Sequence, residues 1–240
     1  MITVSIVSHG HGEMVERLIA QLHKIEAVSQ IILTLNIPER IQIKNNENLT
    51  IVHNDMPFGF GANHNNAFKM CTQAFFCVLN PDIEFVQDPF PALIESINQQ
   101  SLCLASPIIV SSAGIIEDSA REFPTFWSLF RKLFFSFEGR WPLDLNSSVN
   151  YPDWVAGMFM LFTSASYKEI EGFNTNYFMY YEDVDICKRA RNHGYQIGLC
   201  TKVKAIHDAQ RTSRKNIKYL FWHLKSMLRF LLLSSKNNFS

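Results

Sequence analysis

The first 110 residues alternate short apolar runs with stretches of helical periodicity, and this alternation is what most constrains the fold. Apolar runs of five to nine residues are typical of buried strands, and apolar residues spaced three and four apart are typical of helices packed on a sheet. The expected strands are Ile2–Ser8, Gln30–Leu35, Leu49–His53, Ala74–Leu79 and Leu102–Val110, and the expected helices are Glu13–Lys24, Ala62–Cys71 and Pro89–Gln99. Strands that alternate with helices predict an α/β fold, with a mostly parallel central sheet covered by helices on both faces.

The rest of the chain is less regular and carries no repeat or linker. The expected strands are Trp154–Thr163, Tyr195–Leu199 and Val203–Ile206, and the expected helices are Phe126–Phe137, Ser164–Glu171, Glu182–His193 and Asn216–Leu233. At 240 residues the chain is long enough for one large domain. We therefore predict a single domain over 1–240, made of 1–110, 111–210 and a C-terminal amphipathic helix in 211–240.

Composition excludes two broad classes of protein. The 22 Lys and Arg equal the 22 Asp and Glu, so the excess of positive charge that marks a general nucleic-acid binder is absent from the sequence. With 47% hydrophobic and 18% charged residues the chain is also unlike a disordered one. The charge is uneven, however, because residues 201–240 hold nine Lys or Arg against one acid, Asp208. Such an asymmetry often marks a surface that meets an anionic partner.

Cysteine usage and apolar runs bear on location. Five cysteines, an odd number without any CxxC spacing, indicate buried thiols in a reducing compartment rather than disulfides or a zinc site. The start of the sequence lacks the charged and apolar regions of a signal peptide. No apolar run approaches the ~20 residues that span a bilayer. We expect a cytoplasmic protein, or one held at the inner face of a membrane.

Two polar segments follow expected strands, where open α/β sheets bind ligands. Ser8-His9-Gly10 follows the first strand. The segment 57–65, with Gly59 and Gly61, is a turn that enters a helix, and its backbone N–H groups could meet an anion such as a pyrophosphate. The alternative for this segment is a plain glycine turn, which is common before helices.

Asn80-Pro81-Asp82 ends the fourth expected strand. Proline cannot continue a strand through a sheet interior, so Asp82 is expected at the strand tip. A carboxylate there can hold a hard divalent cation that also binds diphosphate oxygens. The alternative is an Asx turn with a solvated carboxylate.

The fourth polar signal is acidic and opens a helix. Glu182, Asp183 and Asp185 follow two tyrosines, Tyr180 and Tyr181. Acids in a first turn cap a helix by interacting with its dipole, but three exceed what a cap needs. A carboxylate in this position could also remove a proton from a hydroxyl group. Further along, His207 is a candidate metal ligand or a structural histidine.

Taken together, these segments resemble the inverting glycosyltransferases of family 2, with the GT-A nucleotide-diphospho-sugar transferase fold, and most nearly their rhamnosyltransferase-like branch. The resemblance extends over about Ile2 to Arg229 and rests on the order and spacing of the motifs. These are Val4–Ser8, Gly59-Phe60-Gly61 with Asn65, Asn80-Pro81-Asp82, Trp154–Gly157, Gly172-Phe173, Phe178–Asp185, Gly194-Tyr195 and His207.

The resemblance assigns roles to these residues. Asp82 and His207 would hold Mg²⁺ or Mn²⁺ with the donor diphosphate. Asp183 would be the catalytic base, with Glu182 and Asp185 supporting it. Donor-binding positions would be Ser8, Asn36, Gly59, Gly61, Asn65, Asn80 and Asp82, and acceptor positions would be Trp154 and Gly157. Residues 1–110 would then be the nucleotide-sugar-binding half and 111–210 the acceptor and catalytic half.

The implied activity is transfer of a sugar, with rhamnose as the candidate, from a nucleotide-diphospho-sugar to a hydroxyl of a cell-surface glycan or lipid-linked acceptor. The motifs depart from the family at Asn80, where a first acid is usual, and at Asn36, whose strand end lacks the usual acid. The first rival is therefore a non-catalytic nucleotide-sugar-binding or partner domain on the same fold. A sugar-phosphate nucleotidylyltransferase is less favoured, because no basic residue follows the first strand before Arg17. A dinucleotide-binding dehydrogenase is disfavoured because that strand is not followed by GxGxxG.

The final helix is amphipathic in pattern. Its apolar stripe consists of Ile217, Leu220, Phe221, Leu224, Met227, Leu228 and Leu231, and its basic edge of Arg214, Lys215, Lys218, Lys225 and Arg229. Such a helix can lie on an anionic membrane or can pack on the domain through its stripe. Both alternatives stand on sequence alone.

Overall fold

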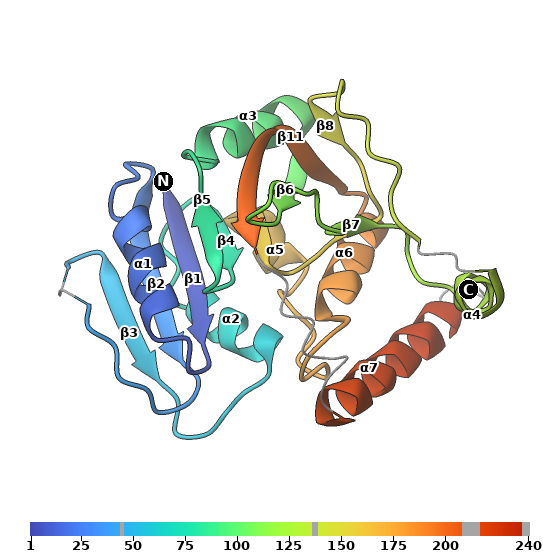
Figure 1. The fold of residues 1–240 in the computed structure, drawn as a ribbon, viewed down its shortest axis with the longest axis horizontal. Coiled ribbons are helices and arrows are strands. Elements are labelled where there is room, and N and C mark those ends of the chain that lie inside the picture. The colour runs from blue at the N-terminus through green and yellow to red at the C-terminus, as the bar shows by residue number, and fades with distance from the viewer. Residues whose placement is uncertain (44–45, 136–138, 208–216, 237–240) are drawn as a thin grey trace.

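A computed structural model describes residues 1–43, 46–135, 139–207 and 217–236. Its centre is a mixed sheet in the order β3-β2-β1-β4-β10-β6-β11-β5, with β8 paired to β11, and a two-stranded sheet β7-β9 lies beside it (Figure 1). The strands are β1 (Ile2–Ser8), β2 (Val28–Leu35), β3 (Leu49–His53), β4 (Phe75–Leu79), β5 (Ile83–Phe85), β6 (Leu102–Val110), β7 (Ala120–Arg121), β8 (Val149–Asn150), β9 (Trp154–Val155), β10 (Phe159–Thr163) and β11 (Gln196–His207).

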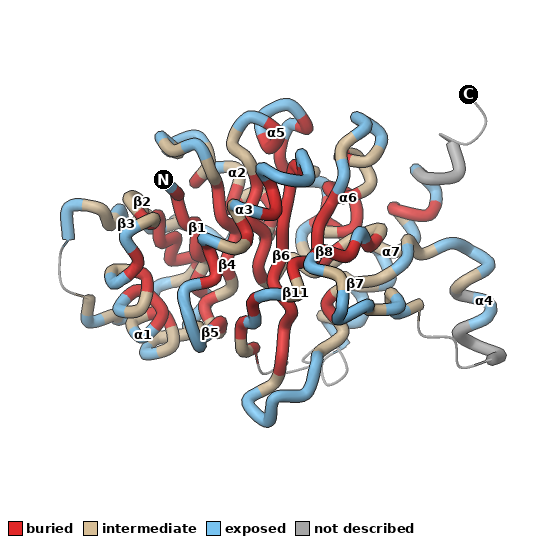
Figure 2. The backbone as a smooth tube through the Cα atoms, turned by 90° about the horizontal axis from the view of Figure 1, so that it is seen from above, coloured by how far each residue is buried: buried red, intermediate tan, exposed pale blue. Residues whose placement is uncertain are grey.

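Six strands of the main sheet point the same way. β1 pairs in parallel with β2 and β4, and β2 with β3, while β6 pairs in parallel with β11. β10 lies between β4 and β6 and is antiparallel to both, so it joins the two parallel groups. Figure 2 shows the central strands buried along most of their length. The expected mostly parallel sheet is confirmed.

The helices are α1 (Glu13–Leu22), α2 (Phe60–Phe68), α3 (Phe90–Gln100), α4 (Phe126–Phe135), α5 (Ser164–Glu169), α6 (Glu182–Asn192) and α7 (Ile217–Lys236). Helix α1 turns Val15, Leu18, Ile19 and Leu22 inward, which is the spacing that defined it in the sequence. These residues join α3 in one apolar cluster on the sheet, while α2, α5 and α6 contribute to a second cluster. Helices therefore cover both faces of the sheet, as expected.

Two expected strand assignments were wrong. The apolar run Trp154–Thr163 is divided into β9 and β10, which belong to different sheets, because 156–158 turns the chain between them. The two short strands expected at 195–206 are one strand, β11. Its pairing with β6 shifts register between Cys200 and Lys204, so the extra residues are accommodated as an irregularity and the strand continues.

The division of the chain into 1–110, 111–210 and 211–240 stays a prediction. Helix α7 lies at the opposite end of the molecule from β3 (Figure 1). Arg214 and Lys215 of its expected basic edge lie outside the described residues. All five cysteines lie in the described part of the chain and are free thiols.

Candidate active site

The carboxyl ends of four parallel strands meet at one edge of the main sheet. β1 ends at Ser8, β2 leads to Asn36, β4 leads to Asn80, and β11 ends at His207. The start of the antiparallel strand β10 reaches the same edge, because the N–H of Asn80 donates to the carbonyl of Met158 at 2.9 Å. Two pockets open beside this edge, and we call them the Asp82 pocket and the Asp183 pocket.

The Asp82 pocket has a volume of about 620 Å³. Its walls are Val7, His9, His11, Asn36, Pro57, Phe58, Phe60, Asn63, His64, Leu79, Asn80, Pro81, Asp82, Phe178, Met179, Lys218, Tyr219 and Trp222. Asp82, one of these lining residues, contacts His207, with 3.3 Å between the carboxylate Oδ2 and the imidazole Nε2. Asp82 therefore stands beside its expected metal-binding partner.

Asp82 is held ionised. Burial pushes its pKa upward, but a hydrogen bond and charge from His207, together with the nearby His11, outweigh burial and hold this pKa below its ordinary value. The other carboxylate oxygen, Oδ1, is buried and has no protein hydrogen-bond partner. An ionised carboxylate oxygen left unpaired beside an imidazole suits a divalent cation.

The protein supplies only part of a metal shell. In the described residues there is no group of three or more His, Cys, Asp or Glu side chains placed to hold an ion. Asp82 and His207 thus fit Mg²⁺ or Mn²⁺ as two ligands, and the remaining positions suit oxygens of a diphosphate. The metal shell stays a prediction.

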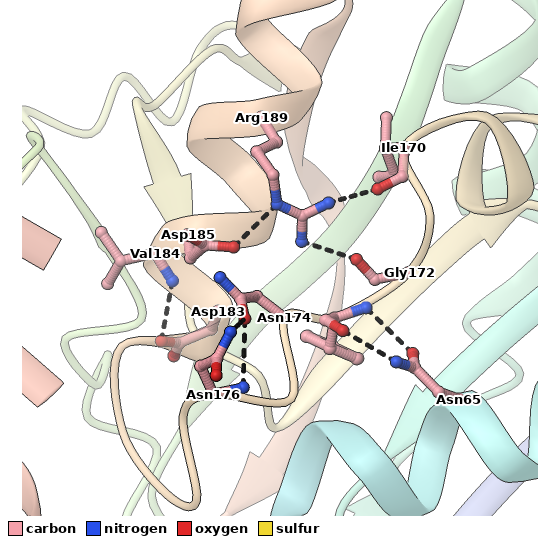
Figure 3. Close-up of polar contacts among 10 residues, drawn as sticks. Asn65, Ile170, Gly172, Asn174, Asn176, Asp183, Val184, Asp185 and Arg189 are labelled. Carbon is pink, nitrogen blue, oxygen red and sulfur yellow. Dashed lines mark hydrogen bonds and ion pairs between the residues drawn. The ribbon is translucent and has the colours of Figure 1, made fainter. Parts of the chain in front are cut away.

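The side chains of three expected donor-binding residues form hydrogen bonds within the protein. The side chain of Asn36 accepts the N–H of Phe58 at 2.9 Å and donates to its carbonyl at 3.0 Å. Asn65 accepts the N–H of Phe173 at 2.9 Å and donates to its carbonyl at 2.7 Å (Figure 3). Ser8 is buried and contacts His11 at 3.4 Å. Asn36 and its partner Phe58 line the Asp82 pocket, whereas Ser8 and Asn65 are absent from its described lining.

The glycine turn serves close packing. A Cβ at Gly59 would lie 2.6 Å from the carbonyl oxygen of Phe178, and one at Gly61 would lie 2.5 Å from Cβ of Phe173. The N–H of Phe60 donates to the carbonyl of Phe178 at 3.0 Å. That backbone donor of the expected anion site is therefore already paired, and the turn instead docks the start of α2 on the 173–178 loop.

The Asp183 pocket lies on the other side of the 178–182 segment and has a volume of about 230 Å³. Its walls are Arg121, Glu122, Pro124, Ser128, Gly139, Trp154, Tyr180, Tyr181, Glu182, Asp183, Val184, His223 and Met227. Helix α6 begins at Glu182 after two tyrosines in the left-handed conformation, with φ of 69° at Tyr180 and 68° at Tyr181. Two such residues in a row cost free energy and are typical of functional sites.

Glu182 is buried and Asp183 beside it is half-buried, and the two acids differ in proton affinity. Oδ2 of Asp183 accepts the N–H of Gly157 at 3.1 Å, and Oδ1 accepts the N–H of Val184 at 2.9 Å. Burial raises the pKa of Asp183, and these two donors together with the charge of Arg121 oppose that rise. Burial, followed by the charge of Asp183, raises the pKa of Glu182 well above its ordinary value, and Oε2 of Glu182 has no hydrogen-bond partner. Glu182 is therefore the neutral acid, and Asp183 the carboxylate.

Asp185 points elsewhere. Its Oδ2 accepts Nε of Arg189 at 2.7 Å, and the same guanidinium donates to the carbonyls of Ile170 and Gly172 (Figure 3). Asp185 is absent from the described lining of the Asp183 pocket. The three acids that look alike in sequence thus differ. Asp183 is the carboxylate at the pocket, Glu182 is the neutral acid, and Asp185 pairs with Arg189.

Gly157 joins the two pockets. A Cβ there would lie 3.4 Å from the ring of Phe60, in the Asp82 pocket, and 3.5 Å from Cβ of Asp183. Trp154 lines the Asp183 pocket and donates its indole N–H to the carbonyl of Glu122 at 3.0 Å. The two expected acceptor positions therefore lie beside Asp183, and their role in acceptor binding stays a prediction.

Sequence reasoning missed several pocket residues. Arg121 of β7 lines the Asp183 pocket, pairs with Asp118 and acts on the charge of Asp183. It carried no signal because it stands alone in an irregular segment. Helix α7 contributes Lys218 and Trp222 to one pocket and His223 to the other. The pattern of that helix indicated an apolar stripe and a basic edge, but it did not indicate which residues line a pocket.

The chain is similar to known glycosyltransferases in sequence and in fold. A family model for the N-terminal domain of galactosyltransferase matches residues 144–214. Rhamnosyltransferase WbbL of Escherichia coli (strain K12) is 28% identical over 258 residues, covering 99% of this chain and 96% of the relative. The chain is a glycosyltransferase by these comparisons, and over nearly its whole length it is similar in sequence to a rhamnosyltransferase. The N-acetylglucosaminyl-diphospho-decaprenol L-rhamnosyltransferase of Mycobacterium tuberculosis is likewise 28% identical to this glycosyltransferase, covering 64% of the chain and 53% of the relative.

Solved structures show the fold of this glycosyltransferase. GalNAc-T7 with UDP, GalNAc and Mn²⁺ superposes with a TM-score of 0.69 at 13% identity, covering 86% of this chain and 43% of that structure. The mannosyltransferase PcManGT of Pyrobaculum calidifontis, with GDP-Man and Mn²⁺, gives a TM-score of 0.60 at 11% identity, covering 88% and 57%. The chain spans about half the length of these two structures. The likeness confirms the GT-A-type fold.

Proposed function

We propose that this chain transfers a sugar from a nucleotide-diphospho-sugar to an acceptor hydroxyl, in a single displacement that inverts the anomeric carbon. The observation that carries the proposal is Asp183, a half-buried carboxylate that accepts two backbone N–H groups at a pocket wall. A carboxylate whose pKa is raised by burial is a better proton acceptor than a solvated one. Because Gly157 contacts both pockets, a sugar held in the Asp82 pocket could meet a hydroxyl held beside Asp183.

The reaction balances as follows. The acceptor oxygen forms a bond to the anomeric carbon while the bond from that carbon to the diphosphate oxygen breaks. The hydroxyl proton passes to Asp183, and the electron pair of the broken bond leaves on the nucleoside diphosphate. A divalent cation bound at Asp82 and His207 would neutralise charge on that leaving group. A retaining reaction would require a separate nucleophile on the other face of the sugar.

The proposed sugar is rhamnose, and the proposed acceptor is lipid-linked. The two relatives described above are named as rhamnosyltransferases, and the Mycobacterium tuberculosis relative is named for a decaprenol-linked acceptor. The solved neighbours hold UDP and GDP-Man, which supports a nucleotide-sugar donor. Residues 1–110 would then form the donor half and 111–210 the acceptor half.

The test is Asp183→Asn. This variant keeps the size of the side chain and loses the base, so we expect a normal melting temperature and transfer reduced by about 10²–10⁴-fold. A panel of nucleotide-sugars with Mn²⁺ is first screened by thermal shift to choose the donor, and transfer is then measured with it. Wild-type transfer rates in the Asn variant would refute the mechanism. A chain that binds donor but never releases nucleoside diphosphate would support a non-catalytic binding domain instead.

We also propose that α7 meets a membrane at the cytoplasmic face. No helix among the described residues is long and apolar enough to cross a bilayer. The apolar stripe of α7 largely faces outward instead of packing on the domain, since Ile217 is 86%, Phe221 62% and Leu228 53% exposed. An amphipathic helix with its apolar side outward can insert into the headgroup region. The free thiols support a reducing compartment.

Flotation with anionic vesicles tests this contact. Phe221→Ser combined with Leu224→Ser removes exposed apolar surface and is expected to reduce the bound fraction severalfold. Val86→Ser, at a residue 70% exposed outside α7, is the matched control and should bind as the wild type does. Equal flotation of all three proteins would exclude a lipid-binding role for the stripe.

A further inference from the structure

Helix α7 forms one wall of the Asp82 pocket, and the residues that form it lie outside the exposed apolar stripe. Lys218, Tyr219 and Trp222 line this pocket together with Asp82. The ring of Trp222 lies 4.7 Å from that of Phe178, whose carbonyl accepts the N–H of Phe60. The wall is therefore joined through Phe178 to the start of α2.

The charges of the pocket are uneven. Lys218 is the one Lys or Arg among the described residues that line it, and Asp82 is the one acid. A donor diphosphate ester carries about two negative charges and Asp82 adds a third, so a divalent cation leaves about one negative charge unbalanced. A further permanent cation is needed for neutrality.

Lys218 is placed to supply that charge. Its Nζ lies 4.9 Å from the centroid of the Trp222 ring, in a cation–π contact between two residues that both line the pocket. Lys binds phosphate oxygens as a compact point charge with three donors. Lys225 belongs to the same helix but is absent from the described lining of this pocket.

We propose that Lys218 binds the diphosphate of the nucleotide-sugar, so that α7 is part of the donor site. This inference rests on the proposed function. When transfer breaks the bond to the sugar, the leaving nucleoside diphosphate gains one negative charge. Lys218 then stabilises the product more than the donor, so it acts on the rate as well as on binding.

The test is calorimetric titration of UDP, GDP and dTDP with Mn²⁺ into the full chain. For whichever nucleotide binds, we expect Lys218→Ala to raise Kd about 5–20-fold and to weaken the dependence of Kd on salt. Lys218→Arg keeps the charge and should stay within about threefold of the wild type. Lys225→Ala removes the same charge from the same helix and should leave Kd unchanged.

Each result decides the proposal. An unchanged Kd in Lys218→Ala overturns it, and so does an equal loss in Lys218→Ala and Lys225→Ala, which would indicate only the overall field of the helix. If Lys218→Ala binds normally while Asp183→Asn abolishes transfer, the proposed function stands and this inference fails. If none of the nucleotides binds the wild type, both fail.

Discussion

Substitution of Asp185 tests whether this acid belongs to the fold or to the chemistry. Asp185→Ala leaves the Arg189 guanidinium without the carboxylate that accepts its Nε at 2.7 Å. The two side chains are 11% and 28% exposed, so the pair is largely shielded from water. Removing one partner of a fully buried ion pair costs about 3–5 kcal/mol of folding stability. Because this pair is partly exposed and Arg189 keeps its two carbonyl partners, we expect a smaller cost of about 2–3 kcal/mol.

The magnitude converts to a measurable shift. In a chain of this size 1 kcal/mol changes Tm by about 2–4 °C, so Asp185→Ala should lower Tm by roughly 4–12 °C. Below that lowered Tm, the rate of transfer should remain within about tenfold of the wild type, because Asp185 does not line the Asp183 pocket. Circular dichroism melts and a transfer assay at a low temperature measure the two effects separately.

The control is Glu13→Ala. Glu13 pairs with Arg17 at 3.9 Å with both side chains largely exposed, so this variant should lose less than about 0.5 kcal/mol. The structural assignment of Asp185 is refuted if Asp185→Ala melts like the wild type yet loses transfer as completely as Asp183→Asn does. That result would place Asp185 in the chemistry, as the resemblance alone implied.

Two further predictions follow from the same site. Gly59→Ala places a Cβ 2.6 Å from a backbone oxygen of Phe178, which no side-chain rotation relieves, so we expect a loss of about 1–3 kcal/mol and weaker donor binding, read by thermal melts and nucleotide titration. Glu182 has a raised pKa in the folded chain, so its contribution to stability is full below its unfolded pKa and is lost as pH rises toward the folded value. Glu182→Gln should therefore lose less stability than the wild type between about pH 5 and pH 8, and equal slopes of Tm against pH would contradict the neutral acid.

Local patterns predicted much of this fold. The strands Ile2–Ser8 and Leu102–Val110 have the bounds expected, and α6 begins at Glu182 as its acidic first turn indicated. These elements are defined by periodicity and by the glycine and proline residues that flank them, which are features of neighbouring residues. Trp154–Thr163 failed for the same reason, because apolar composition does not reveal that the chain leaves one sheet for another at Gly157.

The site was harder to predict because its contacts join distant segments. Gly59 and Asn65 looked like donor-binding residues, but their structural partners, Phe178 and Phe173, lie more than a hundred residues away in the sequence. Similarly, the spacing of Glu182, Asp183 and Asp185 could not show that only one accepts the N–H of Gly157. A motif thus indicated where the chemistry lies but not which of its members face the pocket.

The two left-handed tyrosines explain why α7 is integral to this site. A left-handed residue other than glycine costs about 1–2 kcal/mol, so Tyr180 and Tyr181 together strain the segment by about 2–4 kcal/mol. Rings of α7 offset this strain, since His223 lies 5.3 Å from Tyr180 and 5.4 Å from Tyr181, and Phe230 lies 5.7 Å from Tyr181. Contacts of this kind contribute about 0.5–1.5 kcal/mol each, which is comparable to the strain.

The main chain is fixed from the same side, because the hydroxyl of Ser226 donates to the carbonyl of Met179 at 3.0 Å. The strained segment immediately precedes Asp183 and separates the two pockets, so its conformation decides where the carboxylate stands. Helix α7 therefore has two different sides. Its inner side contacts the segment before Asp183, the proposed base, while its outer side presents most of the apolar stripe. If a surface binds the stripe, we expect it to affect the position of Asp183 as well.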